Sequence, residues 1–400
     1  MAIRTRVSPE ARTTATAHLA LAVADANWFS TANLFSEVER NDVSTLLLSC
    51  IDYRNAWQRG LPPWAWGKAL RPSGPRKWRR EHVLPSGWMK TYPRIGMRPL
   101  SRTIRGWQRR HVPDAALGLV MTYPYYLHLA EMVRPTRTVY YNLDDYALYW
   151  PHCAEAVNAM ERKAVREADL TVCVAKVRAE VLRAAVPEAA NRIKHLPHGA
   201  PARSIGERPW NRPAPSPGDI SHLPRPLIGY VGSIEDRVDW ELMNRLARAF
   251  PNASIVIVGK VPAKSAQRDG WQTDWGEFAS LPNVHTIGWR PQEEIDRYNR
   301  AFDVVLIPYR LDHPFNQVCS PTKIMDVMGT GRPVVSTAVP ECTLYEGLFS
   351  VAHSSEAFVE AVGSILEANS DDGRADLRFD WAKAHTCARV VDRLVDWIRG

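Results

Sequence analysis

Residues 320–336 read Ser320-Pro-Thr-Lys-Ile-Met-Asp-Val-Met-Gly-Thr-Gly-Arg-Pro-Val-Val-Ser336. Ser320 and Pro321 are typical of a helix N-cap and a first helical residue, and Gly329 and Gly331 predict where that helix ends. A β-branched strand follows. A loop, a short helix and a strand in this order form an anion site in open α/β sheets, because the N–H groups at the helix start are free.

Lys323 and Asp326 lie three residues apart on the predicted helix and therefore share one face. An ammonium group can bind phosphate, and a carboxylate can accept hydrogen bonds from hydroxyl groups. This pair suits a nucleoside diphosphate that carries a sugar. The alternative is that Lys323 is an ordinary surface cation and Asp326 a solvated carboxylate.

Short apolar runs that favour strands alternate with helical patterns along most of the chain, which indicates parallel sheets. The predicted strands are 46–51, 117–121, 138–143, 170–174, 227–233, 254–259, 284–288 and 303–308, with helices at 154–168, 238–250 and 291–301. We therefore predict an α/β protein of two Rossmann-like domains facing across a cleft.

The same patterns divide the chain into five parts. A Pro-rich composition marks the linker between the two domains. The predicted parts are an N-terminal helical extension (1–42), an acceptor-side Rossmann-like domain (43–200), the linker (201–226), a Rossmann-like domain that binds the nucleotide sugar (227–380) and a C-terminal helix (381–400).

Segment 320–336 resembles the donor-binding signature of GT-B glycosyltransferases, in particular the large, mostly retaining family that includes sucrose synthase. Asp326 stands at the second Glu of its Glu-x7-Glu motif, and Gly331-Arg-Pro-Val-Val335 matches the end of the signature. Val318 stands where the first Glu belongs. The Ser-Pro-x-Lys form looks like a subgroup that makes surface polysaccharides and teichuronic-type polymers. The likeness runs through roughly residues 43–400.

The resemblance implies a donor site and an activity. The activity would transfer a hexose-type sugar, with retention, from a UDP- or GDP-sugar to a glycan acceptor that is lipid-linked. Gly232 and Ser233 would let the backbone approach the pyrophosphate, and Trp289 and Arg290 would hold the base, although such residues also serve as turns and packing. The implied donor-binding residues are Gly232, Ser233, Arg237, Trp289, Arg290, Ser320, Pro321, Thr322, Lys323 and Asp326.

The first domain would supply the catalytic carboxylates. Asp144 and Asp145 follow a predicted strand, and one of them would act on donor or acceptor while the other caps the next helix. Asp52 resembles part of the first cleft loop. His198 lies in the turn that crosses the cleft, where a lone His is more often structural.

Two further expectations concern the cofactor and the chain end. Asp-x-Asp is absent, so no metal cofactor is expected, and Arg, Lys and a helix N-terminus would neutralise the diphosphate. In similar folds the last helix packs back on the N-terminal domain.

The net charge of +8 is concentrated between residues 54 and 110, where basic residues alternate with tryptophans. This favours an anionic membrane surface. The alternative is that the basic residues form a solvated surface and the tryptophans belong to the core. Nucleic acid is not the expected partner, because no nucleic-acid-binding motif accompanies the charge. The tryptophans are Trp57, Trp64, Trp66, Trp78, Trp88 and Trp107.

The chain has no apolar run of about 18 residues and no signal-peptide core, and its six cysteines are scattered. We therefore expect a cytoplasmic protein, peripheral on the inner face of the plasma membrane. Two rival functions remain open. One is a GT-B-fold sugar-nucleotide epimerase, and the other is a non-catalytic subunit that binds a sugar nucleotide or a glycan.

Overall fold

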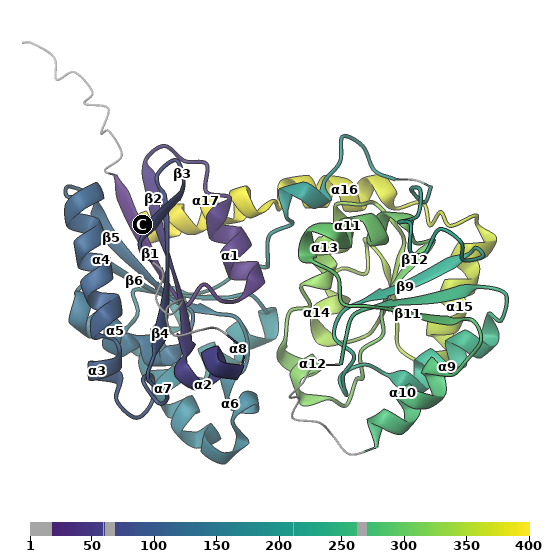
Figure 1. Cartoon of the computed structure of the whole chain (residues 1–400), viewed down its shortest axis with the longest axis horizontal. Coiled ribbons are helices and arrows are strands. Elements are labelled where there is room, and N and C mark those ends of the chain that lie inside the picture. The colour runs from purple at the N-terminus through teal and green to yellow at the C-terminus, as the bar shows by residue number, and fades with distance from the viewer. Residues whose placement is uncertain (1–17, 59, 61–68, 211, 262–269) are drawn as a thin grey trace, which may run out of the picture.

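The computed structural model describes residues 18–58, 60, 69–210, 212–261 and 270–400 and shows two α/β domains side by side (Figure 1). The first domain has an eight-stranded sheet in the order β3-β4-β2-β1-β5-β6-β7-β8. The second has a six-stranded sheet in the order β11-β10-β9-β12-β13-β14. Among the described strands only β3 and β4 pair antiparallel, so the predicted fold class is confirmed.

The strands of the first sheet are β1 (Leu19–Ala24), β2 (Val43–Asp52), β3 (Arg71–Gly74), β4 (Lys77–Leu84), β5 (Ala116–Met121), β6 (Arg137–Asn142), β7 (Leu170–Cys173) and β8 (Ile193–His195). Those of the second are β9 (Leu227–Val231), β10 (Ser254–Val258), β11 (Val284–Gly288), β12 (Val304–Ile307), β13 (Val334–Thr337) and β14 (Ser350–Ala352).

Helices cover the two sheets. The first domain contains α1 (Phe29–Ser36), α2 (Tyr53–Gln58), α3 (Pro93–Gly96), α4 (Arg98–His111), α5 (Leu127–Val133), α6 (Tyr146–Tyr149), α7 (Ala154–Glu167) and α8 (Lys176–Ala185). After the linker come α9 (Trp240–Ala249), α10 (Trp271–Ala279), α11 (Gln292–Ala301), α12 (Pro314–Val318), α13 (Lys323–Met328), α14 (Pro340–Thr343), α15 (Ser355–Glu367), α16 (Ala375–Ala384) and α17 (Cys387–Arg399).

The helical extension predicted over 1–42 is wrong at Leu19–Ala24, which forms the central strand β1, whereas Phe29–Ser36 is helical as predicted. All six residues of β1 are buried and pair in parallel with β2 and β5. A continuous apolar run buried on both faces is what a central parallel strand requires, and it lacks the polar face of a surface helix. Residues 1–17 lie outside the described part of the chain.

The region 60–100, in which no strand was predicted, contains the strand β4, which pairs in parallel with β2. Helix α4 follows it and packs Trp107 completely into the core, with Trp78 against it at 5.8 Å between ring centroids. Trp88 is also buried, whereas Trp57 is exposed. Trp64 and Trp66 lie outside the described residues.

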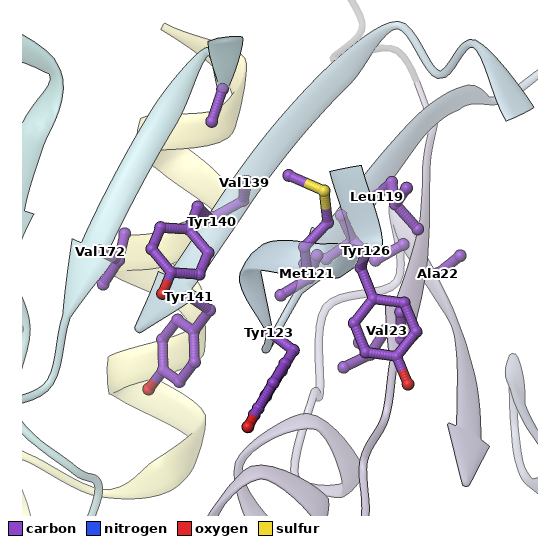
Figure 2. Close-up of a cluster of buried hydrophobic side chains, with 14 of the residues drawn as sticks. Ala22, Val23, Leu119, Met121, Tyr123, Tyr126, Val139, Tyr140, Tyr141 and Val172 are labelled. Atoms are coloured by element: carbon purple, nitrogen blue, oxygen red, sulfur yellow. The ribbon is translucent and has the colours of Figure 1, made fainter. Parts of the chain in front are cut away.

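The core of the first domain lies along β1, β5 and β6 (Figure 2). Figure 2 shows Tyr123 and Tyr126, which follow β5, beside Val23 of β1, and Tyr140 and Tyr141 on β6. These tyrosines bring hydroxyl groups to the carboxyl ends of the central strands.

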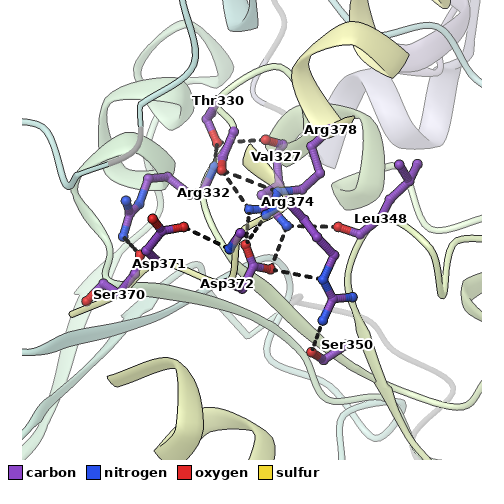
Figure 3. A network of polar contacts seen from close by, with 12 residues as sticks. Val327, Thr330, Arg332, Leu348, Ser350, Ser370, Asp371, Asp372, Arg374 and Arg378 are labelled. Carbon is purple, nitrogen blue, oxygen red and sulfur yellow. Dashed lines mark hydrogen bonds and ion pairs between the residues drawn. The ribbon is translucent and has the colours of Figure 1, made fainter. Parts of the chain in front are cut away.

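A buried polar network holds the end of the segment 320–336 in the second domain (Figure 3). The Arg332 guanidinium donates to the carbonyl oxygens of Phe302, Asp303, Trp210 and Ser370. Arg378 of α16 donates to the carbonyl of Gly331 at 2.8 Å. The turn after α13 is therefore fixed from several elements at once.

The chain crosses between the domains twice, at residues 199–202 and 385–387. The two crossings are hydrogen-bonded to each other, because Ala200 N donates to His385 O and Cys387 N donates to Ala200 O. Helix α17 then packs in the core of the first domain. Most of the Pro-rich segment lies on the second domain, where Trp210 N donates to Thr330 O.

All six cysteines are free thiols. In the described part of the chain, no helix is both long enough and apolar enough to cross a membrane.

Candidate active site in the interdomain cleft

The order of strands in the second sheet reverses between β9 and β12. Ligands of open α/β sheets bind outside the carboxyl ends of the strands at such a reversal. Gly232 and Ser233 follow β9, and Tyr309 follows β12. Helix α13 brings Lys323 over the same point. The fold thus places the predicted phosphate residues at the switch point of the sheet.

Lys323 lies against two tyrosines and the turn after β9. Its Nζ donates to Tyr309 Oη at 2.7 Å and lies 5.1 Å from the ring centroid of Tyr230. A Cβ at Gly232 would meet Nζ at 2.4 Å, so only glycine leaves room for the ammonium group here. The structure therefore requires glycine here for the Lys323 side chain, and the approach of a pyrophosphate to Gly232 stays a prediction.

The predicted N-cap of this helix is shifted in the structure. Helix α13 begins at Lys323 with Thr322 as N-cap, and no side chain caps it. Ser320 is buried, lines the cleft, and its Oγ makes no hydrogen bond. Pro321 and Thr322 also line the cleft. The free hydroxyl of Ser320 is consequently available to a ligand.

Asp326 lies one turn after Lys323 and also lines the cleft. Burial raises the pKa of its carboxyl to about 7, and the nearby Asp296 adds to this, while Arg203 and Lys323 offset it in part. Gln292 Nε2 lies 3.4 Å from both carboxylate oxygens, and Arg203 Nη2 lies 3.9 Å from Oδ1. Its ionised form thus lacks strong partners and can accept hydrogen bonds from ligand hydroxyls.

Arg237 lines the cleft beside Lys323 and faces the first domain. Its Nη2 pairs with Glu235 at 2.8 Å, and its guanidinium lies 5.5 Å from the ring of Tyr309. Two cations therefore converge on the turn after β9. Such a pair can neutralise a diphosphate.

The opposite wall of the cleft carries Asp144, which follows β6. Its Oδ2 accepts a hydrogen bond from Tyr149 at 2.7 Å, and its Oδ1 accepts one from Asp145 N. Burial raises the pKa of Asp144, which Tyr149 and Arg237 partly counteract. The carboxylate thus faces the cation pair of the second domain across the cleft.

His198 lies in the first crossing segment and lines the cleft. Burial lowers its pKa to about 4, so the imidazole is neutral near pH 7. A neutral ring can orient a ligand hydroxyl without adding charge. The cleft between these walls has a volume of about 530 Å³.

Residues 225–368 match a family described as glycosyl transferases group 1. This segment is a glycosyltransferase group 1 domain. It contains α13 and the switch point between β9 and β12.

A curated relative is TuaH of Bacillus subtilis (strain 168), whose name assigns it a glycosyltransferase role in teichuronic acid biosynthesis. It is 22% identical over 191 residues, which is 47% of this chain and 44% of that protein. The match therefore spans less than half the length of the curated relative.

Solved structures share the fold over nearly the whole chain. Sucrose-phosphate synthase from Thermosynechococcus elongatus superposes with a TM-score of 0.69 at 14% identity, over 96% of this chain and 98% of that one. HepE of Anabaena in complex with UDP gives 0.64 at 12% identity, over 95% and 98%. HepE has also been solved with UDP-glucose, with a TM-score of 0.61, 13% identity and coverage of 94% and 98%. The chain has the GT-B fold of these proteins.

The group 1 domain presents the predicted base-binding residues at the end of β11. Trp289 is 59% exposed, and Lys260 Nζ lies 5.5 Å from its ring. The side chain of Arg290 is bound to Asp219 at 2.7 Å and to the hydroxyl of Tyr298 at 2.9 Å. Trp289 is thus free to stack on a ligand, whereas Arg290 is held as part of the wall.

Two predicted catalytic residues do not line the cleft. Asp145 caps α6 by accepting from Ala147 N and pairs with the buried Arg178 at 2.9 Å. Asp52 accepts from Asn55 N at 2.7 Å at the start of α2. Both carboxylates satisfy local backbone donors, as capping residues do, and neither is among the residues that line the cleft.

Several cleft residues were not predicted from the sequence. Trp28 and Phe29 begin α1 and line the first-domain wall. Arg203 lies 5.3 Å from the ring of Phe29 and 3.4 Å from Asp296. These residues come from the misassigned N-terminal segment and the linker, and no local pattern connects them to the group 1 domain.

Proposed function

We propose that the protein is a glycosyltransferase that moves a hexose-type sugar from a UDP- or GDP-sugar to a lipid-linked glycan in surface-polysaccharide synthesis. One observation carries this proposal. Lys323 and Asp326 lie on one face of α13, at the switch point of a group 1 domain. The complexes of HepE with UDP and UDP-glucose support a uridine donor in this fold.

In this proposal the chain neutralises the leaving diphosphate with its own cations. Lys323 and Arg237 stabilise the charge that develops on the diphosphate as the bond to the sugar breaks. Asp326 accepts hydrogen bonds from the ribose, and Trp289 stacks on the base. Because Lys323 and Arg237 neutralise the diphosphate in this proposal, it requires no metal cofactor. Asp144, on the opposite wall, stabilises the positive charge of the sugar. We propose retention of the anomeric configuration, on the resemblance alone.

We further propose that the enzyme works in the cytoplasm on the inner face of the plasma membrane. Six free thiols agree with a reducing compartment. The basic surface of the first domain would bring the cleft to a lipid-linked acceptor. Nucleic acid is not a proposed partner, because the chain carries no nucleic-acid-binding motif.

A donor panel tests the activity. Purified protein is incubated with UDP- and GDP-sugars, and release of UDP or GDP is measured for wild type, Lys323→Ala and Asp326→Ala. We expect Lys323→Ala to lower turnover by about 10²-fold or more, as when one preorganised donor to a developing charge is removed. Lys383→Ala, a half-exposed lysine on α16, is the matched control. Turnover or binding of no donor, or site variants that behave like wild type, would contradict the proposal.

Mass spectrometry and NMR of the products distinguish the rival functions. An epimerase consumes the donor without any acceptor, and a non-catalytic subunit binds the donor but never releases the nucleotide. A transferase yields a new glycoside whose anomeric configuration reports retention or inversion.

A further inference from the structure

The two domains touch across the cleft through a pair of aromatic side chains. Tyr149 of α6 and Phe315 of α12 meet edge-to-face, with 4.7 Å between their ring centroids and an interplanar angle of 69°. Trp28 and Trp150 of the first domain lie farther from the Tyr149 ring, at 6.2 Å and 6.3 Å. Edge-to-face packing sets the orientation of both rings, because it places the positive edge of one on the negative face of the other. Of these neighbours, Phe315 therefore restricts the orientation of Tyr149 most.

The orientation of Tyr149 matters because its hydroxyl group binds Asp144. Tyr149 Oη donates to Asp144 Oδ2 at 2.7 Å, while Oδ1 accepts from the backbone N of Asp145 at 2.9 Å. The Asp145 carboxylate is itself held by Arg178 within the first domain. In the described part of the chain, Tyr149 is the one side chain that donates to the Asp144 carboxylate. The hydrogen bond that depends on an aromatic contact across the cleft is therefore the one from Tyr149.

Phe315 is held in one unit with Arg237, the cation of the second domain. Asn316, the next residue of α12, is fully buried, and its Nδ2 donates to the carbonyl oxygens of Arg237 and Arg310 at 2.9 Å each. His313 caps α12, since its Nδ1 accepts from Phe315 N at 3.3 Å, and its ring stacks on that of Phe315. Because these contacts all lie within the second domain, Arg237 and Phe315 approach or leave the first domain together.

Both domains contribute to the ionisation of Asp144. The titratable groups that face its carboxyl are Asp145, Tyr146, Tyr149, Arg237 and Cys319. Burial raises the pKa of Asp144, whereas the hydrogen bond from Tyr149, the one from Asp145 N and the charge of Arg237 lower it. A hydrogen bond to the charged form favours that form, so loss of the Tyr149 contact favours the protonated acid. A protonated carboxyl cannot stabilise positive charge on a sugar.

We propose that Phe315 is a positioning residue of the transferase, whose ring holds the Tyr149 hydroxyl on Asp144 when the two domains lie in this arrangement. The inference rests on the proposed function, since it takes Asp144 as the carboxylate that stabilises the sugar. When the second domain moves away, Arg237 and Phe315 leave together and Asp144 takes up a proton. The carboxylate is thus ready only while the cations of the donor site lie opposite it.

Two independent readouts test this role. The proteins are wild type, Tyr149→Phe, Phe315→Leu, Phe315→Tyr and the double variant Tyr149→Phe with Phe315→Leu. Carbon-13 NMR of protein labelled at its aspartate carboxyls, with Asp144→Asn to assign the signal, gives the pKa of Asp144 without any donor. The second readout is the pH profile of kcat/KM, and calorimetry measures UDP affinity. Leu377→Ala, at an exposed position of α16, is the control.

We expect Tyr149→Phe and Phe315→Leu to raise the pKa of Asp144, and Phe315→Tyr, which keeps the ring, to leave it unchanged. In the first two variants kcat/KM falls about tenfold on the acid side of the profile, as for one lost hydrogen bond to a charged group. It recovers on the alkaline side, where Asp144 ionises again. The double variant should match Tyr149→Phe alone, because Phe315 acts through the tyrosine.

Four results overturn the inference. They are an unchanged pKa of Asp144 in Phe315→Leu, a loss of kcat/KM that is equal at every pH, additive effects in the double variant, and a loss of UDP affinity beyond about twofold in Phe315→Leu, which would show that the ring acts on the donor site. A wild type that turns over no donor counts against the proposed function instead, because the NMR titration still tests the effect of Phe315 on Asp144.

Discussion

The ligand role proposed for Asp326 comes with a cost to stability. Its pKa is raised to about 7 by burial, from an ordinary value of 3.8. The folded protein therefore binds this proton more tightly than the unfolded chain does. The stability that depends on Asp326 is highest near pH 4 and is lost as the pH rises to about 7.

Asp326→Asn removes this pH dependence, because the amide does not ionise. We expect the variant to gain stability relative to wild type, with a gain about 3 kcal/mol larger at pH 8 than at pH 5, since the difference develops over about two pH units and one unit corresponds to about 1.4 kcal/mol. Urea unfolding at the two pH values measures the difference, with Asp114→Asn as the control. An equal gain at both pH values would show that the carboxyl is ionised throughout. The same variant loses UDP affinity if Asp326 binds the ribose.

At the scale of single residues, the sequence predicted those candidate site residues that belong to one local motif. Lys323, Asp326 and Gly331 lie in one loop-helix-strand segment, and their positions depend on helix geometry alone. Arg203, which contacts both Asp296 and Asp326, lies far from them in the chain. Its position depends on how the linker folds onto the second domain. A periodic pattern in the sequence predicts helices and strands, but it does not predict that packing.

At the level of elements, the C-terminal end of α13 depends on a buried ion pair. The Arg378 side chain is fully buried and pairs with Asp372 at 2.6 Å while it donates to Gly331 O and Leu348 O. Arg378→Met removes the two short contacts to the buried carboxylate of Asp372, which among the described residues keeps only Arg374, through its backbone N at 3.2 Å and its guanidinium at 3.8 Å. We expect a loss of about 3–5 kcal/mol in unfolding free energy, as for other broken buried pairs.

The double variant Arg378→Met with Asp372→Leu should lose less than Arg378→Met alone, since no unpaired charge remains. Urea unfolding of the two single variants and the double variant gives the coupling. Arg245→Met, in the exposed pair with Glu241, is the control and should change stability by less than about 1 kcal/mol. Strict additivity would show that Arg378 acts through its carbonyl contacts and not through the ion pair.

Strands with clear apolar runs were placed correctly from the sequence, and the errors have physical causes. Leu19–Ala24 is apolar at every position, so it has no period that separates a strand from a helix. Lys77–Leu84 contains many charged residues because β4 lies next to the sheet edge. The helix predicted over 381–400 is divided, because Thr386 caps α17 by accepting from Arg389 N at 3.2 Å. That cap fixes where the chain crosses back to the first domain.

At the level of the whole molecule, one edge of the first domain is both apolar and basic. β2 and β4 are parallel neighbours, so the segments after them, containing α2 and α3, lie at the same edge. Trp57 is 72% exposed on α2, and Ile95 is 64% exposed on α3. The exposed basic residues of these segments and of the first turns of α4 are Arg54, Arg94, Arg98 and Arg102. Trp88 and Trp107 are buried in the core, and the partly buried Trp78 packs against it. The membrane hypothesis is therefore restricted to this edge.

We expect the protein to sediment with vesicles that contain phosphatidylglycerol and not with phosphatidylcholine alone. Each cation near anionic headgroups contributes about 1 kcal/mol, so Arg94→Glu, Arg98→Glu and Arg102→Glu together should lower binding by about 10²-fold or more. The matched control is the charge reversal Arg245→Glu with Arg248→Glu on α9, which changes the charge of the second domain and leaves this edge unchanged. Trp57→Ser separates the two contributions, because it removes apolar contact and leaves the charge intact. Sedimentation that does not depend on anionic lipid, or that survives the triple reversal, would show that this edge does not face a membrane.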